Sequence, residues 1–303
     1  MNQQEMEQIQ PLFQPGPASV SYENVRDLPN ALQTRTLIER IWPSYHPHAD
    51  SHFPEDLKQH FHQRTWEMYL WYVLATHGFS PTRAAKKGPD YRLTFNNQRI
   101  WIEAVAPERG NGNDAVPQTV FLNDMIARGM APIAQEVPEE AILLRFANAL
   151  DSKRCQYDKY LDGNLVHERD PFVVAINGCM ATDYRGEPQI PFCIKAALGL
   201  GHLTLLIDPS GKSPTTSHYQ TRTEIIKKNQ QPVSTDLFLR DEYRRVSAIL
   251  YSPSDICNIS SEVGSEMYYL HNPRALNPLP GGIFNFCREY WVTQDGSELQ
   301  WKD

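Results

Sequence analysis

Apolar and polar residues recur along the chain in patterns that predict both helices and strands. Between Pro54 and Phe79, apolar side chains return every three or four residues, which is the spacing of a buried helix face. The same spacing from Glu139 to Leu161 predicts a second long helix. Shorter helices are expected at 32–41 and 191–200, and apolar runs predict strands at 172–176, 203–207, 246–251 and 283–292.

A strand, a tight turn and a second strand are predicted between residues 88 and 105. The turn is Asn96-Asn97, a dipeptide of the kind that favours short hairpin connections. Asp90 opens the first strand, and Glu103 lies inside the apolar run of the second strand. A buried charged carboxylate costs free energy unless a cation pairs with it, so Glu103 is the first candidate for a functional residue.

The order of these elements predicts an α/β fold with a central mixed β-sheet flanked by helices. Residues 1–52 are polar and rich in proline, which predicts an N-terminal helical arm or a loosely packed cap. The main α/β domain is expected over 53–282, with a polar, turn-rich inserted hairpin region at about 208–245. A C-terminal strand and tail are expected over 283–303.

Composition and charge narrow the classes of function. The net charge of −7 argues against a protein that coats nucleic acid nonspecifically, but a local basic patch or a bound metal can still serve a nuclease. No run of 18 apolar residues is present, so no membrane partner is expected. The N-terminus does not resemble an export signal, and the five cysteines form no CxxC pair. These features predict a cytoplasmic protein with reduced thiols.

Asp90 and Glu103 have two possible interpretations. If the strand register sets both carboxylates on one face, they form a site for Mg²⁺, which needs few carboxylates because it keeps several waters. A metal held there would polarise a phosphodiester and activate a bound water. Alternatively, Asp90 caps a turn, and Glu103 pairs with Arg92 or Arg99 at a sheet edge.

Gly88-Pro89-Asp90, followed by Glu103-Ala104-Val105 on the next strand, resembles the motif of the PD-(D/E)xK nuclease superfamily. The resemblance covers roughly residues 60–280 and implies a restriction-endonuclease-like core. It implies that Asp90, Glu103 and the Ala104 carbonyl bind Mg²⁺, or alternatively Mn²⁺. It also implies hydrolysis of phosphodiester bonds, with DNA as the first candidate substrate and RNA as the alternative. Glu67 stands on the first helix where the family often places a further acid; otherwise it is a solvent-facing helix residue.

The chain departs from the family at the third motif residue. Val105 occupies the position where the family has a lysine that positions or activates the attacking water. Some members of the family recruit this lysine from the following helix, and Lys153 is the best-placed substitute here, with Gln156 expected to position the nucleophile. A solvated polar helix face is the alternative for both residues. Lys86 and Lys87, just before the motif, are a second source of positive charge.

A second class of function stays open, in which the fold has lost its chemistry and binds nucleic acid or a protein partner. Val105, the acidic total and the insertion favour that hypothesis. Aromatic residues in or beside the insertion are candidates for stacking on bases, although they also fit an ordinary hairpin surface: Tyr219, Phe238 and Tyr243. Pro209 to Ser213 ends like a phosphate-binding loop, but position 206 is leucine where the first glycine is needed.

Overall fold

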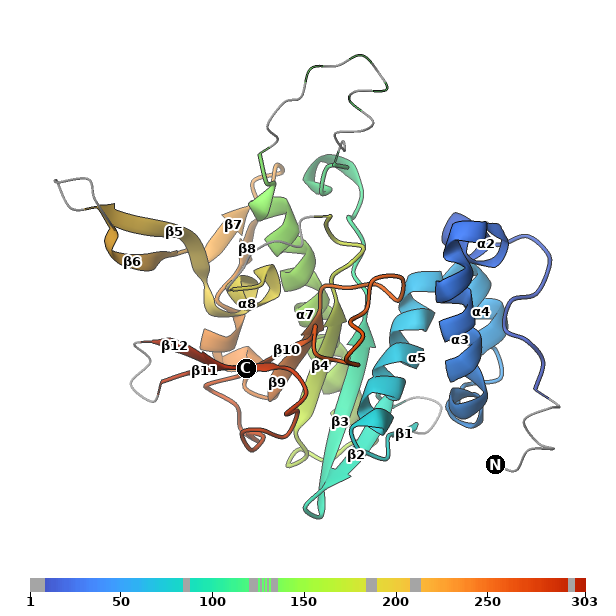
Figure 1. The fold of residues 1–303 in the computed structure, drawn as a ribbon. Helices are drawn as coiled ribbons and strands as arrows, with labels where there is room; N and C mark the ends of the chain where they lie inside the picture. The colour runs from blue at the N-terminus through green and yellow to red at the C-terminus, as the bar shows by residue number, and fades with distance from the viewer. Residues whose placement is uncertain are drawn as a thin grey trace.

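An eight-stranded mixed sheet separates two layers of helices in the computed structural model (Figure 1). The described residues are 9–83, 88–119, 125, 127, 129, 131, 136–183, 190–207, 214–293 and 298–303. The strand order is β1-β2-β3-β4-β9-β10-β11-β12. The strands are β1 (Thr82–Arg83), β2 (Tyr91–Phe95), β3 (Gln98–Val105), β4 (Phe172–Asn177), β9 (Ala248–Ser252), β10 (Tyr268–His271), β11 (Arg288–Val292) and β12 (Leu299–Lys302).

The helices divide between the two faces of the sheet (Figure 1). One face carries α2 (Val20–Asp27), α3 (Leu32–Tyr45), α4 (Phe53–Gln59) and α5 (Phe61–Thr76). The other face carries α7 (Glu139–Asp162) and α8 (Phe192–Leu198). Alternate residues of each strand enter opposite cores: Ile102 and Ala104 pack with the first layer, whereas Trp101 packs with the second. The predicted α/β architecture with a flanked mixed sheet is therefore confirmed.

The predicted hairpin forms the β2–β3 pair. Asn96 and Asn97 have φ values of 49° and 63°, the left-handed conformation that a two-residue hairpin turn requires. The pairing is antiparallel, and Phe95 lies opposite Gln98. Beyond this hairpin, β3 runs parallel to β4, and β4 runs parallel to β9. The carboxyl ends of these three neighbouring strands therefore lie side by side at the same end of the sheet.

The predicted helix from Pro54 to Phe79 is two helices, because the chain breaks at His60 (φ −116°, ψ 49°). The break turns α4 towards the N-terminal helices. There Phe53 stacks on Trp42 of α3, with ring centroids 5.6 Å apart. Helix α5 runs on along the sheet, and ten of its residues are buried. Continuous helical spacing did not reveal the change of direction.

Residues 9–52 pack more firmly than their polar composition predicts. Tyr22 and Tyr45 have no exposed surface, and Trp42 is only 3% exposed. All three belong to the apolar core that also contains α5 and one face of the sheet. A few large aromatic side chains fill this layer. Because most of their neighbours in the sequence are polar, the average composition of the segment did not indicate this packing.

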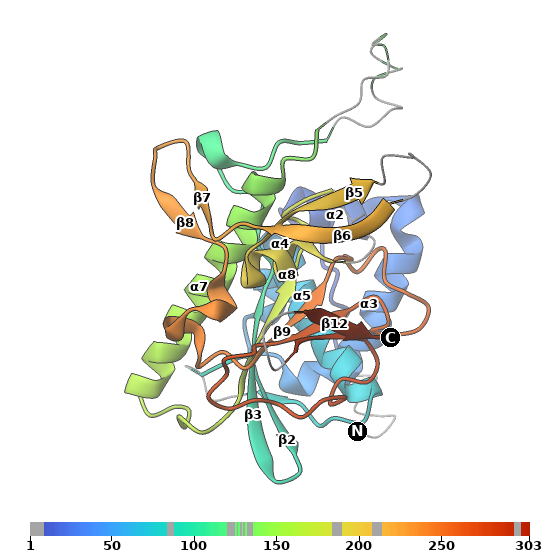
Figure 2. The same cartoon turned by 90° about the vertical axis from the view of Figure 1, so that its left-hand side faces the viewer.

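The apolar run Leu203–Ile207 is not a strand of the main sheet. It belongs to β5 (Leu200–Ile207), which pairs with β6 (Pro214–Thr221) in a separate two-stranded ribbon. In β5, Leu205 is 51% exposed and Ile207 is 62% exposed. The predicted strand is therefore confirmed, and its partner is β6, which an apolar run alone does not identify. Figure 2 shows this ribbon and the small hairpin β7 (Glu224–Ile226) with β8 (Pro232–Ser234) at one end of the molecule.

Part of the predicted polar insertion is buried rather than extended into solvent. Ile225, Leu237, Phe238 and Tyr243 pack into the core formed by α7 and α8. Phe238 is fully buried and Tyr243 is 4% exposed, so neither presents a ring for stacking on bases. Two other predicted features, the lysine pair 86–87 and the loop-like segment 209–213, lie outside the described residues.

The C-terminal part of the chain, from residue 268 onwards, contains more strands than its sequence predicts. The predicted strand at 283–292 is shorter, because β11 begins only at Arg288. β10 and β12 were not predicted; β11 lies between them, parallel to β10 and antiparallel to β12. None of the described helices has the length and apolar character needed to cross a membrane.

Gly178, directly after β4, supplies a test of the packing between the sheet and α7. A Cβ atom on this residue would lie 2.6 Å from the Tyr251 hydroxyl and 3.0 Å from Phe146 Cζ. We predict that Gly178→Ala lowers the free energy of unfolding by about 1–3 kcal/mol, because both rings must move. Urea denaturation measures the change. In the control Gly281→Ala, the new Cβ meets Glu289 Oε1 at an ordinary 3.5 Å. A control change as large as that of Gly178→Ala would contradict the packing argument.

Candidate active site

The strand register places Asp90 and Glu103 on one face of the hairpin. Tyr91 lies opposite Ile102, and each further pair follows in step down to the turn. One more residue in the same register sets Asp90 opposite Glu103. Residues directly opposite in an antiparallel pair project from the same face, so the two carboxylates share one face of the hairpin. The geometric condition for convergence is therefore met.

Glu103 is buried and takes its cation from α7. Its side chain is 7% exposed, and its Oε1 atom lies 2.9 Å from Lys153 Nζ. The alternative pairing within the hairpin is wrong for Arg99, whose Nε lies 3.6 Å from Asp170 Oδ2. Arg92 is exposed to solvent. The cation beside Glu103 thus comes from α7, the helix that follows the hairpin among the described elements.

Asp90 is held at the start of β2 by the backbone of β3. Its Oδ2 atom accepts a hydrogen bond from Ala104 N–H at 2.8 Å. Burial and the negative charge of Glu103 raise the pKa of Asp90 to about 7, against the lowering effects of the Ala104 hydrogen bond, Lys153 and Arg83. The negative charge of Glu103 therefore helps to bring the protonation of Asp90 near neutral pH.

Lys153 stays charged in this position. Burial acts to lower the pKa of its ammonium group, but the nearby carboxylates of Glu103, Asp90 and Glu67 outweigh burial and raise it. The side chain is 21% exposed, so the ammonium group is not sealed from solvent. One cation therefore faces three acidic side chains from two other elements, the hairpin and α5.

Tyr160 is a site residue that sequence reasoning missed. Its hydroxyl donates towards Glu103, at 3.3 Å from Oε2 and 3.4 Å from Oε1. The side chain of Gln156 hydrogen-bonds the same hydroxyl. Tyr160 lies four residues after Gln156, so the helical spacing that puts both on one face of α7 is a signal that was available. Gln156 thus reaches the site through Tyr160.

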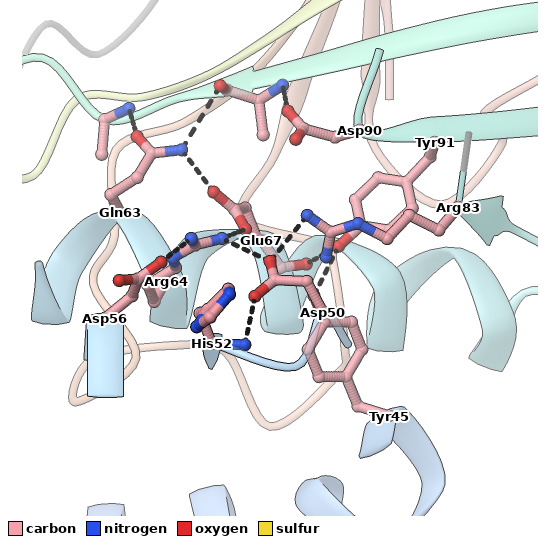
Figure 3. Close-up of polar contacts among 12 residues, drawn as sticks. Tyr45, Asp50, His52, Asp56, Gln63, Arg64, Glu67, Arg83, Asp90 and Tyr91 are labelled. Atoms are coloured by element: carbon pink, nitrogen blue, oxygen red, sulfur yellow. Dashed lines mark hydrogen bonds and ion pairs between the residues drawn. The ribbon is translucent and has the colours of Figure 1, made fainter. Parts of the chain in front are cut away.

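Glu67 projects from α5 and is buried, which rules out a solvent-facing position. It is 5% exposed, its Oε1 accepts from Gln63 Nε2 at 2.9 Å, and its Oε2 accepts from Arg64 at 2.8 Å. Burial and the charge of Asp90 raise the pKa of Glu67, while Arg64 and Gln63 lower it. Figure 3 shows Gln63, Glu67 and Asp90 gathered where α5 meets the hairpin.

Two arginines link this carboxylate to the N-terminal layer (Figure 3). Arg64 pairs with Glu67 and also with Asp50, at 3.3 Å, and with Asp56. Arg83 of β1 pairs with Asp50 at 2.9 Å. The charges around Glu67 therefore balance within a network that includes residues from the N-terminal layer.

The donor chemistry of Asp90, Glu103 and the Ala104 carbonyl fits a hard divalent cation. Carboxylate and carbonyl oxygens are the ligands that Mg²⁺ and Mn²⁺ favour, and Mg²⁺ needs only one or two carboxylates with waters. The raised pKa of Asp90 marks a like-charge pair that a cation would relieve. Within the part of the chain that the structure describes, no group of three or more His, Cys, Asp or Glu side chains forms a metal cage.

The structure thus brings Asp90, Glu103, Lys153, Gln156 and Glu67 together around the end of β3. Tyr160, Gln63 and Arg64 join them. Comparison of the chain with protein-family models, with curated proteins and with solved structures found no match.

Proposed function

We propose that this protein is a metal-dependent nuclease that hydrolyses phosphodiester bonds, with DNA as its substrate. The observation that carries the proposal is the contact between Lys153 Nζ and Glu103 Oε1, 2.9 Å long, in a hairpin that sets Asp90 opposite Glu103. Two acids and a lysine are the three charged groups that the motif resemblance requires. Here the lysine comes from α7, because position 105, where the motif has its lysine, is valine.

The order of elements supports the same proposal. Helix α5 carries an acid, β2 and β3 form the hairpin with the two further acids, α7 carries the lysine, and β4 returns parallel to β3. That order is the one implied by the resemblance to the PD-(D/E)xK nucleases. The fold by itself does not carry an activity, so the side chains of the site carry the argument.

In the proposed mechanism, Asp90, Glu103 and the Ala104 carbonyl would hold Mg²⁺ or Mn²⁺. The bound cation would polarise the phosphodiester and lower the pKa of a water molecule. Lys153 contributes a positive charge beside Glu103, where it would orient the attacking water and neutralise a phosphate oxygen. Tyr160 holds the Glu103 carboxylate by a hydrogen bond, and Gln156 hydrogen-bonds the Tyr160 hydroxyl in turn. Glu67 would orient a second cation or a water from the α5 side.

Cleavage assays test this proposal. We expect degradation of labelled DNA that requires Mg²⁺ or Mn²⁺ and stops with a chelator, and we expect slower degradation of labelled RNA. Asp90→Ala and Glu103→Ala should each lower the rate by at least about 100-fold, because each removes a metal ligand. The exposed residue Asp162, at the end of α7, supplies the control Asp162→Ala, which should leave the rate unchanged. Equal rates in wild type and in both site variants would contradict the assignment.

A second candidate function is a non-enzymatic module that binds nucleic acid or a protein partner. It is favoured by one observation: the buried Glu103 carboxylate has a cation of the protein itself, Lys153, as its ion-pair partner. In such a module, Lys153 would be a structural partner of the buried acid. Metal binding separates the two candidates, because only the nuclease needs a cation between Asp90 and Glu103.

A further inference from the structure

Gln63 of α5 joins three groups at the end of β3 (Figure 3). Its Oε1 accepts from Ala106 N–H at 2.8 Å. Its Nε2 donates to Glu67 Oε1 at 2.9 Å and lies 3.4 Å from the Ala104 carbonyl oxygen. One side-chain amide thus contacts the backbone on both sides of Val105 and also the acid of α5.

The chemistry of these three groups requires an amide. A backbone N–H can only donate, and a carboxylate or carbonyl oxygen can only accept. A side chain that satisfies all three must therefore present an acceptor to Ala106 and a donor to Ala104 and Glu67. Glutamine does so. Glutamate would instead place a carboxylate oxygen, which is an acceptor, against the acceptor oxygens of Glu67 and Ala104. The contacts also fix which way the amide of Gln63 faces.

We propose that Gln63 is a positioning residue, which sets the direction of the Ala104 carbonyl and of the Glu67 carboxylate for cation binding. This inference rests on the proposed function. Ala104 is tied from both sides: its N–H donates to Asp90 at 2.8 Å, and its carbonyl faces Gln63. Groups that hold the ligands of a metal change its affinity even though they do not touch it.

The test is Gln63→Met, which keeps the length of the side chain but removes its donor and acceptor. In the metal-free protein, amide hydrogen exchange at Ala106 should accelerate, because the N–H loses its partner. In calorimetric titration, the Kd for Mn²⁺ should rise by about 10-fold or more. Gln59→Met, at the exposed end of α4, is the matched control and should change neither quantity.

The outcomes separate this inference from the proposed function. An unchanged Kd in Gln63→Met, with binding abolished in Asp90→Ala, would overturn the role of Gln63 and leave the metal site intact. A wild-type protein that binds no Mn²⁺ would overturn both. Faster exchange at Ala106 with an unchanged Kd would show that Gln63 is only a structural link, which also overturns the proposal. Equal denaturation midpoints of Gln63→Met and Gln59→Met would show that a higher Kd for Mn²⁺ does not come from partial unfolding.

Discussion

Asp90→Asn is expected to stabilise the metal-free protein at pH 8 and to abolish its response to Mn²⁺. The pKa of Asp90 is raised to about 7 in the folded protein, whereas an unfolded chain has the ordinary value near 3.9. Between these two values, the folded state binds a proton that the unfolded state has lost. The stability that Asp90 contributes is therefore full below about pH 4 and is lost as the pH rises through 7.

Asparagine at position 90 cannot ionise, and its side-chain oxygen can still accept from Ala104 N–H. We expect Asp90→Asn to raise the free energy of unfolding at pH 8 by about 2–4 kcal/mol relative to wild type, with little difference at pH 4. Urea denaturation without metal, measured from pH 4 to pH 8, shows the effect. The control Asp162→Asn changes an exposed carboxylate at the end of α7. A variant less stable than wild type at pH 8 would show that Asp90 is not under strain.

Lys153→Met is expected to have the second large effect, a loss of both stability and activity. It leaves Glu103 buried without a cation, and breaking a buried pair in this way costs about 3 kcal/mol. We expect the rate of DNA cleavage to fall by about 10²–10³-fold, because the charge beside the phosphate is lost. Denaturation and cleavage assays measure the two effects at a temperature where the variant is folded. Lys159→Met, on the exposed face of the same helix, is the control.

A double variant separates the structural effect of Lys153 from its chemical effect. In Glu103→Gln combined with Lys153→Met, residue 103 no longer places a buried charge without its cation, so most of the lost stability should return. Activity should stay as low as in the single variants, because the metal ligand and the lysine are both gone. If the double variant were no more stable than Lys153→Met, the ion pair would not explain the loss.

Local patterns in the sequence were sufficient to predict the parts of the site that lie in regular elements. The turn at Asn96-Asn97, the helix that carries Lys153 and the burial of Glu103 depend on spacing and composition over a few residues. Each of these is set by short-range physics, namely turn conformation, helical periodicity and the apolar neighbours of one acid. The contact of Lys153 with Glu103 was a hypothesis from resemblance, because nothing local fixes how α7 lies on the sheet.

Contacts between distant elements account for what could not be predicted. Gln63 and Tyr160 reach the end of β3 from two different helices, on opposite faces of the sheet. Which helical residue points there depends on packing, and a polar residue on a helix has many solvent-facing alternatives. The same limit explains β5, which was predicted as a strand but whose pairing with β6, in a separate ribbon, could not be predicted.

Calorimetric titration with Mg²⁺ and Mn²⁺ tests the central claim, that Asp90 and Glu103 form a cation site, most directly. We expect saturable binding to the wild-type protein at pH 8, with weaker affinity at pH 6, because a cation must displace the proton from Asp90. Asp90→Ala and Glu103→Gln should abolish that binding, while Asp162→Ala should preserve it. Absence of binding by the wild-type protein up to millimolar metal would contradict the site and favour the non-enzymatic module.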